Sequence, residues 1–237
     1  MLWLQAEERA GGGAMSTAIS REKTAPQVQS DPRPKGARTR DRLLDLAFES
    51  MVTKGFAATS IEELADGAGI SKSGFFYHFK DKHDLARAVL TRFRAHNDAL
   101  FDRLAARARE LSDDPLHSFL IFLKLYAEEV TPLMDLAPGC LVSTIAYQER
   151  CFAHDIRLAN ADMVEAWRAR FRVWLEEIAA VYGQPAELEL LVDAGWSAIF
   201  GAFTLAKTRG RADVVAAQVL LYRDTISRVF LQARRGG

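Results

Sequence analysis

The sequence predicts an all-α protein, with a small three-helix domain near the N-terminus and a larger helical domain after it. From Thr39 onward, apolar residues recur at the three- and four-residue spacing of amphipathic helices, and no segment alternates as a strand does. Proline and glycine lie mainly between the periodic segments. The chain has 237 residues, of which 49% are hydrophobic, so it can bury a sizeable core.

Residues 1–37 show no helical or strand periodicity. They contain a run of three glycines at 11–13 and a DPRPKG run at 31–36. This composition predicts a disordered N-terminal arm.

The next segments predict helices at about 38–54, 61–68 and 72–78, followed by a fourth helix that Asp81 caps. Gly55 ends the first helix, and Ser60 followed by Glu63 forms a capping-box signature for the second. Only Gly69 and Ile70 separate the second helix from the third, which is the spacing of a helix-turn-helix motif.

The third helix is rich in aromatic residues. Phe75 and Phe79 are four residues apart and are expected to pack inward, and the remaining side chains then face outward: Lys72, Ser73, Tyr77 and His78. Polar and aromatic groups on an exposed short helix suit contacts with phosphates and base edges. The alternative is a small amphipathic core helix.

Residues 59–82, TSIEELADGAGISKSGFFYHFKDK, resemble the DNA-binding signature of TetR-family transcriptional regulators, and the similarity extends from about Arg38 to Phe93. The resemblance implies a homodimeric repressor that binds palindromic operator DNA and is released by a small-molecule effector. It also implies a helix-turn-helix domain at 38–93, with a linking helix to about 108, and a ligand-binding and dimerisation domain at 109–237. A cytoplasmic location and no cofactor are expected.

The resemblance assigns DNA contacts to nine residues: Thr59, Ser60, Ser71, Lys72, Ser73, Gly74, Tyr77, His78 and Lys82. The family often has threonine at the position of Gly74 and tyrosine at that of Phe76. Here, one side chain that touches bases and one hydroxyl that bonds phosphate are therefore absent. Arg38 and Arg40 are candidates for further phosphate contacts, or else are solvated charges at the start of a helix.

Further helices are predicted at about 115–130, 140–149, 155–182, 186–208 and 212–233. Residues 194–206, AGWSAIFGAFTLA, are apolar nearly all round and mix small with large side chains, so they should be buried on more than one side. The last two helices resemble the family's dimerisation helices. The alternative is the core of a monomeric bundle.

An apolar effector cavity is expected between the long helices. The candidates to line it are Tyr126, Cys140, Tyr147, Trp167, Phe171, Trp196 and Phe203. Each aromatic residue is alternatively plain core. Residues 111–200 are acidic, which would suit a cationic ligand, with Glu128, Glu129 or Asp162 as the counter-charge; otherwise these carboxylates form solvated faces.

Cys140 starts a short helix within a Gly-Cys-Leu motif similar to that of TetR-type regulators in which a cysteine senses electrophiles or oxidants. A helix N-terminus lowers the pKa of a thiol and raises its reactivity. The alternative is a buried small hydrophobic residue.

Several classes of protein are disfavoured by the sequence. The two cysteines make no disulfide framework, and the five histidines lack metal-ligand spacing. No apolar run approaches the length of a transmembrane helix, and no pairing of acid and base residues indicates an enzyme. The main rival is a helical small-molecule-binding dimer that has lost sequence-specific DNA binding.

Overall fold

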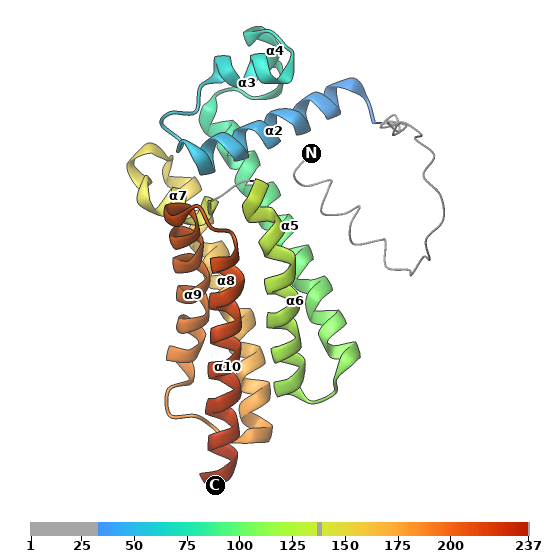
Figure 1. The fold of residues 1–237 in the computed structure, drawn as a ribbon. Helices are drawn as coiled ribbons and strands as arrows, with labels where there is room; N and C mark the ends of the chain where they lie inside the picture. Colours follow the sequence, from blue (N-terminus) through green and yellow to red (C-terminus); the bar gives the residue numbers. More distant parts are fainter. Residues whose placement is uncertain (1–32, 137–138, 237) are drawn as a thin grey trace, which may run out of the picture.

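The computed structural model describes residues 33–136 and 139–236, where all regular secondary structure is helical (Figure 1). The prediction of an all-α fold is therefore confirmed. The helices are α2 (Lys35–Thr53), α3 (Ile61–Ala68), α4 (Lys72–His78), α5 (Lys82–Leu111), α6 (Pro115–Leu136), α7 (Leu141–Tyr147), a 3-10 turn (Glu149–Cys151), α8 (His154–Tyr182), α9 (Leu188–Arg209) and α10 (Asp213–Gly236).

Two bodies of unequal size share α5. Helices α2, α3 and α4 cross one another at one end of the molecule, and α5 leaves them to run along a bundle of long helices (Figure 1). In that bundle α6 packs against α5 and α10, and α9 packs against α8 and α10. Helix α7 lies at the junction, where it contacts both α2 and α8.

The helix-turn-helix boundaries follow from strong local signals. Ser60 caps α3, and the helix ends at Gly69, whose φ of 69° is a left-handed conformation that glycine adopts without strain. Ser71 and Asp81 cap α4 and α5 through side-chain oxygens that accept from the backbone N–H of Gly74 and Asp84. The predicted ranges 61–68 and 72–78 are therefore confirmed.

Helix α2 begins three residues earlier than predicted. Pro34 has a φ of −53°, and its carbonyl accepts from the backbone N–H of Arg38 at 3.2 Å, which completes a first helical turn. Assigning residues 35–37 to a disordered arm was wrong, because the DPRPKG composition hid this turn. The rest of the expected arm, residues 1–32, lies outside the described residues.

Helix α6 continues through Pro132 to Leu136, whereas the prediction ended it near residue 130. A proline inside a helix removes one N–H donor but leaves the other backbone bonds of the turn available. Packing along both α5 and α10 stabilises α6 over its length, and this tertiary contribution outweighs the local signal.

Candidate functional site

Helix α4 turns Phe75 and the adjoining Phe79 inward, and leaves Phe76 exposed on the same side as its polar groups. Phe75 and Phe79 are 0% and 2% exposed, and their ring centroids lie 5.8 Å apart. The guanidinium of Arg40 on α2 lies 4.5 Å from the centre of the Phe79 ring, which holds α4 against α2. Tyr77 is 84% exposed and packs edge-on against the half-buried His78. The predicted orientation is confirmed.

The N-terminal end of α4 presents three exposed polar side chains. The hydroxyl of Ser71 accepts from the backbone N–H of Gly74 and lies 2.8 Å from the hydroxyl of Ser73. Lys72 binds Glu62 on α3 at 2.5 Å, and this hydrogen bond is the main reason that the pKa of Glu62 falls to about 2. This end of α4 therefore offers hydroxyls and an ammonium group to the surroundings.

Gly74 sits in a tight place on α4. A Cβ at this position would lie 3.3 Å from the Cβ of Ile70, close enough that Ile70 would have to shift slightly. The absence of a side chain at Gly74 is thus matched to the packing of the turn.

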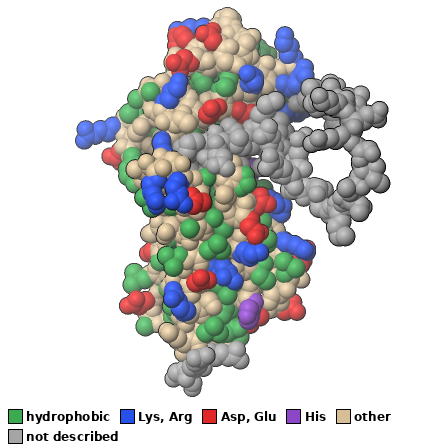
Figure 2. Space-filling model, in the orientation of Figure 1, with side chains coloured by type: hydrophobic (Ala, Val, Ile, Leu, Met, Phe, Trp, Pro, Cys, Tyr) green, Lys and Arg blue, Asp and Glu red, His purple; other side chains and the backbone are tan. Residues whose placement is uncertain are grey.

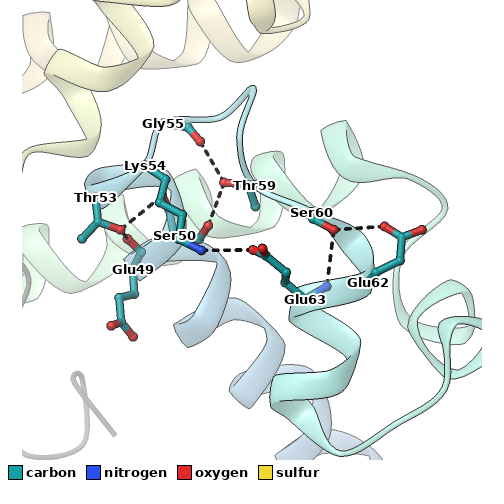
Figure 3. A network of polar contacts seen from close by, with 9 residues as sticks. All are labelled: Glu49, Ser50, Thr53, Lys54, Gly55, Thr59, Ser60, Glu62 and Glu63. Carbon is teal, nitrogen blue, oxygen red and sulfur yellow. Dashed lines mark hydrogen bonds and ion pairs between the residues drawn. The ribbon is translucent and has the colours of Figure 1, made fainter.

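Ser60 starts α3, but the full capping box does not form (Figure 3). Its hydroxyl accepts from the backbone N–H of Glu63 at 3.4 Å and donates to Glu62. The carboxylate of Glu63 does not reach back to Ser60 but pairs with Lys54 at 3.1 Å. The capping-box prediction was therefore only half correct, because Lys54 at the end of α2 offers Glu63 a charged partner.

The structure corrects the prediction that the side chain of Thr59 contacts DNA. The residue is 2% exposed, and its hydroxyl donates to the carbonyl of Gly55 at 2.9 Å and bonds Ser50 at 3.1 Å (Figure 3). With its hydroxyl used inside the fold, Thr59 secures the loop between α2 and α3 and does not face a phosphate.

Lys82 points toward the same loop. Its ammonium donates to the carbonyl of Ala57 at 3.1 Å and lies 4.5 Å from the centre of the Phe56 ring, and desolvation lowers its pKa. A phosphate contact for this half-buried lysine stays a prediction, and so do the DNA contacts of Ser60, Ser71, Lys72, Ser73, Gly74, Tyr77 and His78.

Phe56 connects the helix-turn-helix to the rest of the molecule. Its ring lies 4.3 Å from the Phe152 ring and 5.2 Å from His83, and its backbone N–H donates to the side chain of Gln148 at 2.9 Å. Nearby, the ammonium of Lys207 on α9 donates to the carbonyl of Val52 at 2.5 Å, at the C-terminal end of α2. The end of α2 is therefore held from α9, and the loop after it is held from the end of α7.

A cavity of about 350 Å³ lies in the bundle, at the lower end of the size range of small-molecule sites. It is bounded by α5, α6, α8 and α9, and six of its thirteen lining residues are aromatic. The larger lining side chains are Phe101, Asp102, Arg109, Phe122, Trp167, Arg170, Phe171, Trp174 and Trp196.

Three of the predicted ligand residues line this cavity, namely Trp167, Phe171 and Trp196. Tyr126 is buried beside it, with its ring 5.7 Å from Phe101, but is not part of the wall. Phe203 is half-buried on α9 and also lies outside the wall.

Tyr147 was wrongly assigned to the cavity, because it is 79% exposed at the end of α7. The short helix turns Leu141, Val142 and Ile145 inward, and this leaves Tyr147 on the opposite side.

Cys140 does not have the electrostatics of a reactive thiol. It caps α7, which has only 7 residues, and packs against the core. Burial raises the pKa of its thiol, and this outweighs the lowering by bonds from Ser143 and Val142. The expectation of a lowered pKa was wrong, and the structure favours the alternative of a small hydrophobic residue.

Sequence reasoning missed the polar part of the cavity. Arg170 lies three residues after Trp167 and four before Trp174, so helical spacing alone would have placed it on the same face. Arg109 and Asp102 come from α5, and no local signal in the sequence links them to α8. In the described part of the chain, no group of three His, Cys, Asp or Glu side chains is arranged to hold a metal.

Comparison with known proteins is decisive for the helix-turn-helix region. Residues 43–89 match the family model described as bacterial regulatory proteins, tetR family. The chain therefore carries a TetR-family DNA-binding domain. It is 27% identical to the transcriptional regulator AcuR of Cereibacter sphaeroides over 200 residues, which cover 80% of this chain and 89% of AcuR.

Two further relatives give the extent of the similarity. The transcriptional repressor KstR2 of Mycolicibacterium smegmatis is 38% identical over 79 residues, covering 33% of this chain and 35% of KstR2. The crystal structure of a TetR-family regulator from Agrobacterium tumefaciens matches with a TM-score of 0.68 at 18% identity, covering 82% of this chain and 99% of that one. The matches to named regulators support a TetR-family transcriptional regulator, of a family that is generally non-enzymatic, and the solved structure supports the fold.

Proposed function

We propose that this TetR-family protein is a cytoplasmic repressor that binds palindromic operator DNA as a homodimer and leaves it when a small molecule occupies the cavity in the helical bundle. The main support for DNA binding is the orientation of α4, in which Phe75 and Phe79 are buried while Tyr77, two serines and a lysine are exposed. A relative that is 38% identical over 79 residues is named a transcriptional repressor.

The exposed end of α4 has the chemistry that DNA contacts require. Lys72 supplies a positive charge, Ser71 and Ser73 supply hydroxyls for phosphate oxygens, and Tyr77 supplies a ring and a hydroxyl. In the free protein Lys72 is paired with Glu62, which holds its ammonium group in place. A DNA phosphate would replace Glu62 as the partner of Lys72.

Helices α9 and α10 support the homodimer. Figure 2 shows hydrophobic side chains between charged ones on the surface over these helices, and exposed leucines there include Leu190, Leu205, Leu220 and Leu221. A Cβ added at Gly201 on α9 would meet no atom of another element within 4 Å, so a partner helix could approach closely there. Two copies of this surface would place two recognition helices on successive half-sites.

The composition of α9 would also fit a membrane-spanning helix. Among the described residues, α9 is long and apolar enough to span a membrane, and 33% of its apolar window is buried. Core and interface helices of other proteins pass the same test, and α9 packs along α8 and α10. A second subunit packed against α9 would bury its exposed apolar face.

Contacts across the junction supply a route from the cavity to the DNA. The cavity is lined by α5 and α8, and these two helices are also joined near the helix-turn-helix by the pair Arg87–Asp155. His83 on α5 lies 3.3 Å from the carbonyl oxygen of Cys151. A ligand that favours one spacing of α5 and α8 would therefore favour one position of α4.

Salt dependence separates the regulator from the rival, a ligand-binding dimer without specific DNA binding. DNA fragments that the purified protein retains are sequenced, and affinity for the recovered site is measured by fluorescence anisotropy across a salt series. Binding should weaken steeply with salt, because counterions are released from phosphates. No enriched site, or affinity independent of salt, would exclude the regulator.

A matched pair of variants tests the role of α4. Lys72→Met should weaken operator binding and reduce the log–log salt slope by about one per half-site. Lys124→Met removes a comparable exposed charge, paired with Glu128 on α6, and should leave both quantities unchanged.

A further inference from the structure

Helix α4 exposes an aromatic ring that carries no polar group. Phe76 is 46% exposed, and it lies next to the still more exposed Tyr77. In the described part of the chain that precedes Leu111, these two are the only large hydrophobic side chains that are exposed. Single exposed hydrophobic residues are common on protein surfaces, but two neighbours on the helix proposed to enter a DNA groove indicate a contact surface.

The ring of Phe76 rests on a buried base. Its centroid lies 5.5 Å from that of Phe75, with an angle of 89° between the two rings, which is a favourable edge-to-face arrangement. Phe75 is fully buried and packs in turn against Phe79. The inner part of the Phe76 ring is therefore supported by the core, and the outer part is presented to a partner at little cost in side-chain entropy.

Phe76 shares its side of α4 with polar groups. Lys72 precedes it by four residues and Ser73 by three, which are the spacings that place helical side chains next to one another, and all three residues are exposed. Lys80 just beyond the helix is also exposed. A partner that fits this surface must offer both negative charge and an apolar group.

The major groove of DNA meets both requirements. Its edges carry phosphates, and the apolar group that base pairs present within it is the C5-methyl group of thymine. Phe76 has no hydroxyl to donate to a phosphate oxygen, so its ring gains most by covering apolar surface.

We propose that Phe76 is a specificity-determining residue, whose ring packs against the methyl group of one thymine in each half-site. This inference rests on the proposed function and deepens it, because it gives the helix-turn-helix a side chain that selects a base. Lys72 and the serines of α4 would fix the register on the phosphates, and Phe76 would contribute to the choice of sequence.

Replacing thymine by uracil removes only this methyl group. The full-length protein first selects duplexes from a random library, and affinity for the selected site is measured by fluorescence anisotropy. Thymines are then replaced by uracil, one position of the half-site at a time. At one position, binding should weaken by about fourfold for each half-site that is changed, which is the effect of uncovering one methyl group.

Phe76→Ala assigns the effect to this ring. At the sensitive position the variant should bind thymine and uracil equally, because the methyl group has lost its partner, and a double-mutant cycle isolates this pairwise effect. Its salt slope should match that of the wild type, since no phosphate contact is removed. If Phe76→Ala does not fold, Phe76→Leu takes its place and should show a smaller preference for thymine than the wild type.

Tyr77→Ala is the matched control, because it removes the neighbouring exposed ring and should leave the preference for thymine over uracil unchanged. A selected site in which no thymine shows the dependence would overturn the inference. So would a preference that is undiminished in the Phe76 variant, or one that falls equally in Tyr77→Ala. Each of these results leaves the proposed function standing, because a specific site is still bound, whereas the absence of any enriched sequence overturns the proposed function and this inference with it.

Discussion

Removing the Gln148 side chain should loosen the loop between α2 and α3. Its Oε1 atom accepts from the backbone N–H of Phe56 at 2.9 Å, and the Phe56 ring is 4% exposed beneath Phe152. In Gln148→Ala this N–H loses its acceptor inside the fold. An unsatisfied buried donor costs about 1–3 kcal/mol, and the lower half of that range applies because Gln148 is only half-buried and water can enter.

Amide hydrogen exchange measures this loss at the site. A cost of about 1.4 kcal/mol corresponds to a tenfold change in an equilibrium constant, so protection of the Phe56 amide should fall by about tenfold. Amides in the middle of α10 should exchange as in the wild type. Gln148→Glu is the control, because its carboxylate can still accept from Phe56 and should keep most of the protection.

Equal protection of Phe56 in Gln148→Ala and the wild type would refute the reasoning, since it would mean that the bond contributes nothing in solution. A uniform loss of protection over the whole chain would also refute it. That result would make Gln148 a general stability residue and not a local fastening of the helix-turn-helix to α7.

Other perturbations test the remaining assignments. Thr59→Val should lower the free energy of unfolding by about 1–2 kcal/mol in urea titrations, because buried hydrogen bonds to Gly55 and Ser50 are lost, while the salt slope of DNA binding stays unchanged. Near neutral pH, mass spectrometry should find Cys140 alkylated by iodoacetamide more slowly than Cys151, because burial raises the pKa of the Cys140 thiol and keeps it protonated. The alkylation rate of Cys140 should keep rising with pH in the range where the rate of an ordinary thiol has become constant. Equal rates for the two cysteines near neutral pH would contradict this. Leu221→Glu should shift sedimentation toward monomer, whereas Leu158→Glu, on an equally exposed leucine of α8, should not.

The parts of the fold that local chemistry determines could be read from the sequence. Ser60 and Asp81 start α3 and α5 through side-chain oxygens that accept from a backbone N–H, and Gly69 ends α3 in a left-handed conformation; each signal is confined to a few residues. The course of α6 through Pro132 could not be read in this way, because it depends on packing against α5 and α10.

In the candidate sites, too, locally determined features could be predicted from the sequence, whereas features that depend on tertiary contacts could not. The spacing of Phe75 and Phe79 was enough to predict which side of α4 faces outward. A resemblance gives the position of Thr59 but not the direction of its hydroxyl, which a contact with Gly55 decides. Arg109 reaches the cavity from α5, 65 residues before Trp174 in the chain, so only the folded arrangement brings the two together.

Lys207 has a consequence for how such a protein changes over time. The ammonium group of Lys207 on α9 donates to the last carbonyls of α2, at Val52 and Thr53. The helix proposed to join two subunits therefore also holds the DNA-binding domain. In a dimer built on α9, a substitution between the subunits would alter the distance between half-sites without any inducer. Selection on partner choice and selection on binding-site spacing would then act on the same helix and could not proceed independently.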